Sequence, residues 1–470
     1  MQETWSTSAG LDVHLDLSGS RPKARLESAL RDAVRSGRLA AGTALPSSRS
    51  LARDLGVARN TVSQAYAQLV AEGWLSARHG SGTWVAQRAG DLAAPSPVAV
   101  AAAARGPRYD LRPGTPDLTA FPRAAWLAAA RKALAAAPAA DLGYADPRGL
   151  EVLRVALAEY LSRARGVRVT PDRVVVCAGF SQGLELVCEV LHARGTRLLA
   201  VESAGSLGHR NIAARAGLRC VPLPVDDRGA AVGELTSAGT GAVLLTPAHQ
   251  FPLGAALAPE RRRQVADWAA QTGGVVIEDD YDGEFRFDRQ AVGALQPLAP
   301  EHVVYAGTAS KSLAPGLRLG WLVLPAGLLD AVGTAKSAAG RLSSSLDQLA
   351  LAELIRSGGY DRQVRRARLA YRRRLDLLRG ALTRHVPEVR VTGIAAGLHA
   401  VVALPAGVTE TEVVARAAAR GLAVQGLADF RAGEQEAGPA LVVGYAKPPP
   451  HAFSAAVARL CASLRDVIGA

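Results

Sequence analysis

One of the few lysines in this chain stands in a segment suited to covalent chemistry. Only five lysines occur among the 55 lysine and arginine residues. Lys311 follows an apolar run, Val303 to Ala306, that is typical of a buried strand, and Gly307 ends this run. A lysine amine forms a Schiff base when its surroundings lower its pKa, whereas arginine stays protonated and cannot. Lys311 therefore indicates a covalent carbonyl partner, with an ordinary surface lysine as the alternative.

A second stretch, residues 274–287, favours the covalent interpretation. It has the pattern of a buried strand that ends in carboxylates and a tyrosine. Pyridoxal 5'-phosphate (PLP) needs a carboxylate at its pyridine nitrogen, a hydroxyl donor near its ring oxygen, cations for its phosphate and a lysine for its aldehyde. The chain supplies these parts in the order that fold-type I PLP enzymes use: Asp279, Tyr281, Lys311 and Arg318. Residues 109–470 resemble an aminotransferase domain of that fold.

Two short segments are expected to hold the phosphate. An apolar strand from Val174 runs into a glycine turn, and the first N–H groups of the helix after such a turn bind phosphate well. We expect this cradle at Gly179, Phe180 and Ser181, with Thr308 and Ser310 beside Lys311.

The resemblance implies three further cofactor contacts. Residues 143–154 match the pattern Tyr-x-Asp-Pro-x-Gly-x-x-x-Leu-Arg, in which the tyrosine, here Tyr144, reaches the phosphate of the partner subunit. This match implies an obligate dimer. Residues 246–254 match the turn near the ring oxygen, where His249 or Gln250 could donate. No metal site is expected, because no second ligand lies at a useful sequence spacing from His249.

Two positions depart from the family pattern. Ser206 stands where relatives place an aromatic residue against the pyridine ring, so either Phe180 or another residue substitutes or PLP is held more weakly. Asp429 stands where members that bind an amino-acid carboxylate carry an arginine, and an aspartate there would repel a carboxylate. Arg431 and Lys447 are the other cations nearby. These departures argue against an α-amino acid as the effector.

Residues 1–88 have the pattern of a small DNA-binding domain. Helical spacing begins near Pro22, a second short helix is capped by Ser47 or Ser48, and a third helix spans Ala58 to Ala71. A β-hairpin with a basic, glycine-rich tip follows. This sequence closely resembles the winged helix-turn-helix of the GntR regulators.

The third helix of such a domain enters the major groove, while the wing reaches the minor groove. The second helix opens with hydroxyl and cationic groups that suit a phosphate. The expected DNA contacts are Ser48, Arg49, Arg59, Asn60, Thr61, Ser63, Gln64, Arg78, His79 and Gly80.

Composition sets the outer limits. At 470 residues the chain is long enough for two or three domains, and residues 89–108 form an alanine- and proline-rich linker. The four cysteines have no paired spacing and are predicted to be free thiols. No apolar run is long enough to span a membrane, and no secretion signal is apparent, so we expect a cytoplasmic protein. The net charge of +13 favours a polyanionic partner.

A basic stretch, residues 362–374, is predicted to be helical, with Val364, Leu369, Leu375 and Leu378 available for packing. A solvated face is the ordinary interpretation of such a charge run, and a second DNA-contacting surface is the alternative.

Taken together, the chain resembles the MocR subfamily of GntR-type transcription factors. The resemblance implies a winged head (1–88), the linker (89–108) and an α/β fold-type I aminotransferase-like domain (109–470), with a large subdomain at about 130–340 and a small one at about 341–470. It also implies a homodimer, head-to-tail and domain-swapped, whose heads contact two half-sites of a double-stranded operator.

Three functions remain open for such a protein. We favour a regulator of vitamin B6 synthesis or salvage that senses PLP itself, as in the PdxR group. An amino-acid-responsive regulator, as in the GabR group, is the second hypothesis. A working aminotransferase with a DNA-binding head is the third, and the sequence does not decide whether transamination occurs.

Overall fold

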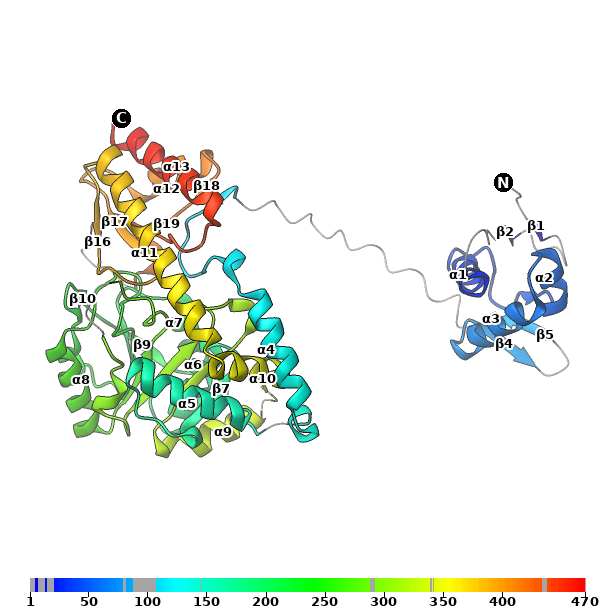
Figure 1. The fold of residues 1–470 in the computed structure, drawn as a ribbon, viewed down its shortest axis with the longest axis horizontal. Helices are drawn as coiled ribbons and strands as arrows, with labels where there is room; N and C mark the ends of the chain where they lie inside the picture. Colours follow the sequence, from blue (N-terminus) through cyan, green and yellow to red (C-terminus); the bar gives the residue numbers. More distant parts are fainter. Residues whose placement is uncertain are drawn as a thin grey trace. The chain divides into compact units, whose positions relative to one another are not determined.

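The computed structural model describes residues 5–6, 13–14, 21–78, 82–87, 107–144, 146–287, 292–338, 340, 342–432 and 438–469. They form two compact units, Met1–Arg105 and Gly106–Ala470 (Figure 1). Of the predicted linker, only residues 107 and 108 are among the described residues.

The first unit is a winged helix-turn-helix, as predicted. The helix spacing of Leu26, Leu30 and Val34 places these side chains in the core, and Val62 and Leu69 are also buried. The helices are α1 (Pro22–Arg35), α2 (Ser48–Asp54) and α3 (Arg59–Ala71). The strands of the three-stranded sheet, in the order β3-β5-β4, are β3 (Ala44–Leu45), β4 (Leu75–Arg78) and β5 (Gly82–Val85). Strand β3 was not predicted. A further two-stranded pair is formed by β1 (Trp5–Ser6) and β2 (Val13–His14).

The second unit is built on a seven-stranded sheet in the order β7-β15-β14-β13-β12-β8-β9. Only β15 runs antiparallel to its neighbours. The strands are β7 (Val174–Cys177), β8 (Leu198–Glu202), β9 (Arg219–Leu223), β12 (Ala242–Leu245), β13 (Val275–Asp279), β14 (Val303–Thr308) and β15 (Gly320–Val323). The carboxyl ends of the parallel strands therefore meet at one edge, where ligands of α/β sheets bind.

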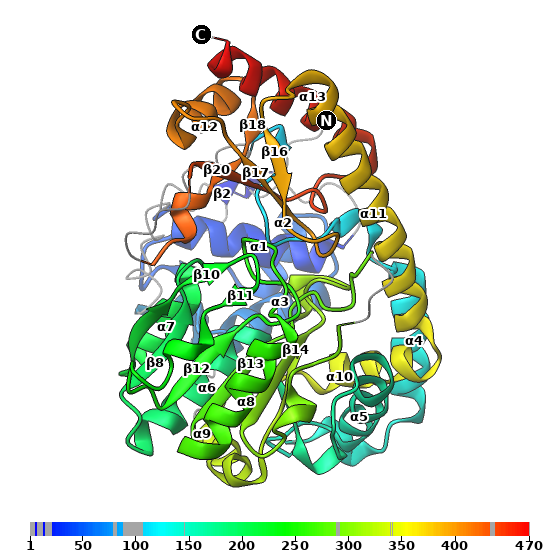
Figure 2. The ribbon, with the colours of Figure 1, turned by 90° about the vertical axis from the view of Figure 1, so that its left-hand side faces the viewer.

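Helices cover both faces of this sheet (Figure 2). One face packs on α6 (Phe180–Ala193), α7 (Leu207–Arg215) and α9 (Leu329–Ala338). The other face packs on α8 (Pro259–Thr272) and α5 (Glu151–Arg165). Alternate residues of one strand point to opposite faces: Val175 and Cys177 of β7 face α6, while Val174 and Val176 face α5. Because helices bury both faces of the sheet, successive residues of a strand are all apolar in the sequence.

Two more helices, α4 (Arg123–Ala136) and α10 (Ser345–Arg356), pack against each other, and α11 (Gly359–His385) leads from α10 to a smaller sheet. That sheet has the order β16-β17-β20-β19, formed by β16 (Arg390–Thr392), β17 (Ala400–Ala403), β19 (Gln425–Gly426) and β20 (Ala440–Val443). It is accompanied by α12 (Glu410–Ala419) and α13 (Pro450–Ile468). The start of the unit joins this part, because β6 (Tyr109–Asp110) pairs with β18 (Leu422–Ala423). A short hairpin pairs β10 (Val225–Asp226) with β11 (Gly229–Ala230).

The packing of α11 corrects one detail. Val364, Leu375 and Leu378 are buried as predicted, but Leu369 is 57% exposed. It lies on the arginine-rich side of the helix, away from the core. The four cysteines are free, and no helix in the described part is both long and apolar enough to cross a membrane.

Candidate cofactor site and nucleic-acid interface

A cavity of the second unit opens where the predicted cofactor residues converge. Its volume is about 340 Å³. Strands β7, β13 and β14 end at it, so residues distant in sequence share one wall. The predicted residues that line it are Gly179, Phe180, Ser181, Asp279, Tyr281, Thr308, Ser310, Lys311 and Arg318. It is also lined by Gly114, Glu202, Ser206, His209, Arg210, Thr246 and Phe251, among others.

Lys311 lies on a short loop that β14 and β15 close. Thr308 at the end of β14 is the Cα partner of Gly320 at the start of β15. The Thr308 hydroxyl accepts from the backbone N–H of Ser310 at 3.1 Å, which fixes the loop just before the lysine. The Lys311 amine donates to the Gly114 carbonyl. Burial lowers the pKa of the amine, while Asp279 and Asp282 act in the opposite direction. A lowered pKa is what a nucleophilic lysine needs.

Asp279 is the last residue of β13 and lies inside the protein with an exposed fraction of 5%. Its Oδ1 atom has no hydrogen-bond partner in the structure. Burial raises the pKa of this carboxyl well above its usual range, and the Lys311 cation opposes that shift. A buried carboxyl oxygen without a partner is unusual in proteins and indicates a missing donor. A protonated ring nitrogen is such a donor.

A cation and a helix N-terminus meet at another part of the cavity. Gly179 precedes α6 with φ 86°, a conformation that favours glycine, and no side chain caps the helix. A Cβ atom at Gly179 would lie 3.6 Å from the guanidinium of Arg318. The free N–H groups of α6, with Arg318 and the hydroxyl of Ser181, form a set of donors suited to a phosphate.

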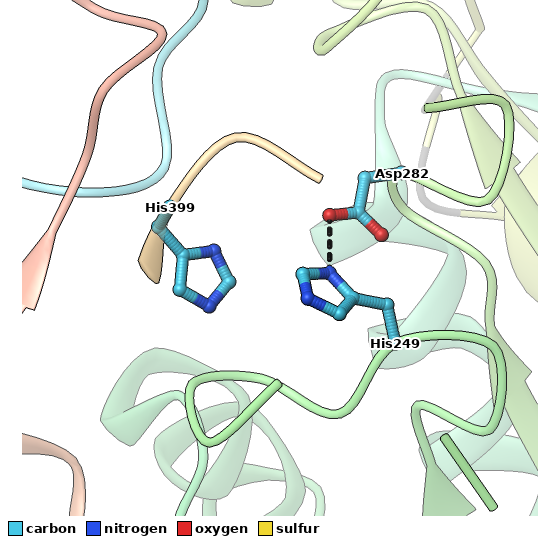
Figure 3. A group of neighbouring side chains, drawn as sticks. All are labelled: His249, Asp282 and His399. Atoms are coloured by element: carbon cyan, nitrogen blue, oxygen red, sulfur yellow. Dashed lines mark hydrogen bonds and ion pairs between the residues drawn. The ribbon is translucent and has the colours of Figure 1, made fainter. Parts of the chain in front are cut away.

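Tyr281 contacts a buried cluster formed by His249, Asp282 and His399, whose side chains are drawn in Figure 3. The Nδ1 atom of His249 lies 2.8 Å from Oδ2 of Asp282 and 3.1 Å from the Tyr281 hydroxyl. His399 stacks at a tilt on His249, with 5.1 Å between ring centroids, and its Nε2 lies 3.0 Å from the Pro252 carbonyl. Burial lowers the pKa of His399 to about 3. His249 therefore orients the tyrosine hydroxyl from outside the cavity.

This placement corrects the expectation that His249 or Gln250 donates directly to the ring oxygen. Neither side chain lines the cavity. The Gln250 amide nitrogen donates to the carbonyls of Ala204 and Phe251 at 2.7 Å, and its oxygen accepts from the Leu253 N–H. Its hydrogen-bonding groups are thus used within the wall, and Tyr281 is left as the hydroxyl donor.

The sequence argument against a metal at His249 also needs correction. Asp282 and His399 do lie beside it, with one ligand-type atom of each within 4.8 Å of the others. However, the Asp282 oxygen is engaged by His249, and one nitrogen of His399 faces the Pro252 carbonyl. A Cβ atom at Gly397 would lie 2.3 Å from Asp282 and 2.4 Å from His249, so the cluster is tightly packed. These contacts favour an orienting role.

His209 and Arg210 are among the cavity residues that sequence reasoning missed. His209 packs on Phe180 with 4.8 Å between ring centroids, and burial lowers its pKa to about 4. The Arg210 guanidinium donates to the carbonyls of Gly205, Phe430 and Arg431 at 3.1 to 3.2 Å. Both lie on α7, which Ser206 caps by accepting from the His209 N–H. Their positions three and four residues after Ser206 are the signal that could have found them.

Three other residues lie elsewhere. Asp429 is exposed and does not line the cavity. Lys447 forms an ion pair with Asp110 at 2.7 Å. Tyr144 is fully exposed and contributes nothing to the cavity of its own chain.

The described DNA-contacting candidates lie at the surface of the first unit. Arg49 on α2 and Arg59, Asn60 and Gln64 on α3 are exposed, as is Arg78 at the end of β4. Ser48, Thr61 and Ser63 are partly exposed. The opposite side of α3 is fixed by the buried Tyr66, whose hydroxyl donates to the Pro46 carbonyl at 3.0 Å. His79 and Gly80 lie outside the described residues.

Comparison with known proteins joins these two units in one family. Residues 22–85 match the family "Bacterial regulatory proteins, gntR family", and residues 114–436 match "Aminotransferase class I and II". The chain is 34% identical over 414 residues to the HTH-type pyridoxine biosynthesis transcriptional regulator PdxR of Corynebacterium glutamicum, covering 87% of this chain and 88% of the relative. This chain belongs to the MocR-like group of GntR-type transcriptional regulators.

Other relatives share this architecture. This chain is 34% identical over 378 residues to the probable rhizopine catabolism regulatory protein MocR of Rhizobium meliloti. The alignment covers 76% of this chain and 76% of that relative. Among solved structures, the α-aminoadipate aminotransferase LysN of Thermus thermophilus, in complex with N-(5'-phosphopyridoxyl)-L-leucine, is 26% identical with a TM-score of 0.68. That similarity covers 77% of this chain and 92% of LysN. The second unit therefore has the fold-type I aminotransferase fold.

Proposed function

We propose that this regulator binds PLP through Lys311 and responds to PLP itself, controlling genes of vitamin B6 synthesis or salvage in the cytoplasm. The observation that carries the proposal is the buried Asp279 Oδ1, which has no partner and shares one cavity with the partly buried amine of Lys311. A cationic ring nitrogen and an aldehyde on one planar molecule complement this pair. The name of the Corynebacterium glutamicum relative, a pyridoxine biosynthesis regulator, supports the same assignment.

The residues of the cavity fit this cofactor. Asp279 would hold the ring nitrogen, Tyr281 the ring oxygen and Lys311 the aldehyde carbon. The α6 N-terminus, Ser181, Ser310 and Arg318 would hold the phosphate, and Thr308 fixes the loop between them. When bound, PLP supplies a reactive carbonyl conjugated to an electron-withdrawing ring.

The protein contributes binding and orientation. His249 and Asp282 direct the Tyr281 hydroxyl, and burial lowers the pKa of the Lys311 amine. Binding would change the regulator's behaviour only if two arrangements of the protein differ in their affinity for PLP.

We also propose a homodimer that places two heads on separated half-sites of one operator. Among the described residues, exposed large apolar side chains concentrate on the segment around α4 and the start of α10. These side chains are Leu118, Leu127, Leu134, Leu142, Tyr144, Leu342 and Leu346. Exposed apolar patches of this kind mark protein–protein contacts. Tyr144, which its own cavity does not use, would then be available to the partner's phosphate.

The test is an absorption titration of the purified protein with PLP. The wild-type protein should develop the visible band of a lysine-bound cofactor, and the Lys311→Ala variant should not. The matched control is Lys447→Ala, which removes a lysine paired with Asp110 outside the cavity and should keep the band. DNA binding without PLP should be equal in all three proteins. An unchanged band in Lys311→Ala would contradict the assignment.

A second candidate, an amino acid as co-effector, is favoured by Arg210. This cation lines the cavity and donates only to backbone carbonyls; no carboxylate pairs with it in the described part of the chain. It could receive the carboxylate that Asp429 was expected to repel. A panel of amino acids added to the PLP-bound protein decides: a band shift caused by one of them, lost in Arg210→Gln, would establish an amino-acid effector.

A further inference from the structure

Helix α11 exposes a set of arginines that none of these functions uses. The helix carries nine arginines and two aspartates over 27 residues. Some already have partners: Arg374 is buried against Asp117 at 2.8 Å, while Arg362 and Arg368 donate to backbone carbonyls. Asp361, one of the two aspartates, is taken by Arg163 of α5 at 2.8 Å.

Of the other six arginines, four lie close together and are exposed, and they form the basic face of α11: Arg365, Arg366, Arg372 and Arg373. Within the described ranges, no carboxylate forms an ion pair with any of these four guanidinium groups. Their opposite side is fixed by the buried Val364, Ala367, Tyr371, Leu375 and Leu378. The basic face is thus held outward by a packed core.

Helical geometry turns these four residues into a regular array. Arg365 and Arg372 are seven residues apart, as are Arg366 and Arg373. Seven residues are about two turns and advance the helix by about 10.5 Å, so each pair points in nearly the same direction. Figures 1 and 2 both show α11 along the outside of the second unit, leading from α10 toward α13. The array is therefore exposed over about two and a half turns.

We propose that the basic face of α11 is a second, sequence-independent contact for the backbone of the DNA that the head binds. Double-stranded DNA carries about one negative charge per 1.7 Å, so 10.5 Å of duplex passes about six phosphates. Arginine forks bind phosphate oxygens in pairs and resist deprotonation. The inference rests on the DNA-binding function of this regulator but not on PLP.

The experiment uses the full-length protein and a 60-base-pair duplex of random sequence. Fluorescence anisotropy gives the affinity at KCl concentrations from 50 to 300 mM. The test variant is Arg365→Gln/Arg366→Gln/Arg372→Gln/Arg373→Gln. Because each phosphate contact contributes about 0.9 to the slope of log K against log salt, we expect a slope smaller by about two to four units.

Two control variants separate the array from general charge. Arg215→Gln/Arg219→Gln/Arg263→Gln/Arg390→Gln removes the same charge from exposed, scattered positions and should change the slope by less than about one unit. The quadruple lysine variant at 365, 366, 372 and 373 should retain most of the slope. Circular dichroism spectra of all variants should match the wild-type spectrum, which checks that the variants are folded.

Two results would overturn the proposal: a wild-type slope in the glutamine variant of α11, or equal losses in both glutamine variants. The Arg59→Ala variant, titrated in parallel, tests the head separately. If the glutamine variant of α11 keeps the wild-type slope while Arg59→Ala loses affinity, the proposed DNA contact of α11 is wrong. The assignment of the DNA-binding head is then still supported.

Discussion

Replacing Asp279 by asparagine should change the stability of the apo-protein and its affinity for PLP in opposite directions. The carboxyl is buried, its Oδ1 has no donor, and burial raises its pKa well above the usual range. A raised pKa means that this carboxyl favours the folded state below its unfolded pKa, and that this contribution is lost as pH rises through its folded pKa. As the pH rises above the unfolded pKa, the wild-type protein therefore bears a growing penalty for burying this carboxyl.

Asparagine removes the charge while keeping the shape. We expect Asp279→Asn to raise the free energy of unfolding of the apo-protein at pH 8 by about 1–3 kcal/mol, because burying a neutral amide costs less than burying a carboxylate. The same change removes the ionic partner of the ring nitrogen. Truncating a buried charge pair costs about 2–5 kcal/mol, which corresponds to a loss of PLP affinity of roughly 30-fold to a few thousand-fold.

The assay is urea unfolding of the apo-protein together with an absorption titration with PLP. The control is Asp280→Asn at the next residue. Asp280 accepts two bonds from Arg165, at 2.6 and 3.0 Å, and one from Tyr305 at 2.8 Å. Breaking this buried pair should lower stability by about 3–5 kcal/mol with a smaller effect on affinity. An Asp279→Asn protein that is less stable and binds PLP normally would refute the assignment of this carboxylate.

Further outcomes test the head, a buried acid and a close backbone approach. Arg59→Ala should lose affinity for the protein's own promoter region in a gel-shift assay while keeping the PLP band, whereas Arg25→Ala on α1 should bind normally; normal binding by Arg59→Ala would remove α3 from the interface. Burial raises the pKa of Glu284 to about 7, so its stabilising contribution is present below about pH 4.5 and lost as pH rises through about 7. Glu284→Gln should therefore be more stable than wild type by about 2–3 kcal/mol at pH 8 and no more stable at pH 4.5, measured by urea unfolding at both pH values. Gly320→Ala should lower PLP affinity at least about tenfold in an absorption titration, because its Cβ atom would lie 2.9 Å from the Gly179 backbone and displace the start of α6.

Part of the cavity was predictable because some of its lining residues follow strands. The sequence patterns place Asp279, Thr308 and Gly179 just at or after the ends of β13, β14 and β7, and parallel strands bring those ends to one edge. Backbone topology thus converted distant motifs into one site. The same logic identified α3, because its apolar spacing fixes which side is buried and which is free for DNA.

The parts that escaped prediction depend on side-chain direction. His249 and Gln250 flank the expected turn, but only the folded wall shows that both point away from the cavity. His399 lies 150 residues later, just before β17, and it joins His249 in a contact that no local spacing reveals. Arg210 was missed because an arginine in a helix ordinarily reads as surface charge. Leu369 was assigned to the core because its spacing fits two faces of α11, and the arginines occupy the same side.

The loop that carries Lys311 has a kinetic consequence. Its ends, Thr308 and Gly320, are bonded neighbours in adjacent strands, and Arg318 just before Gly320 adopts a left-handed backbone conformation with φ 51°. The conformational entropy of Lys311 and Arg318 is therefore lost when the protein folds. Ligand binding does not have to order these residues again. A ligand that meets such a rigid receptor gives up little to loop ordering, so differences in affinity among variants of this loop should appear mainly as differences in residence time.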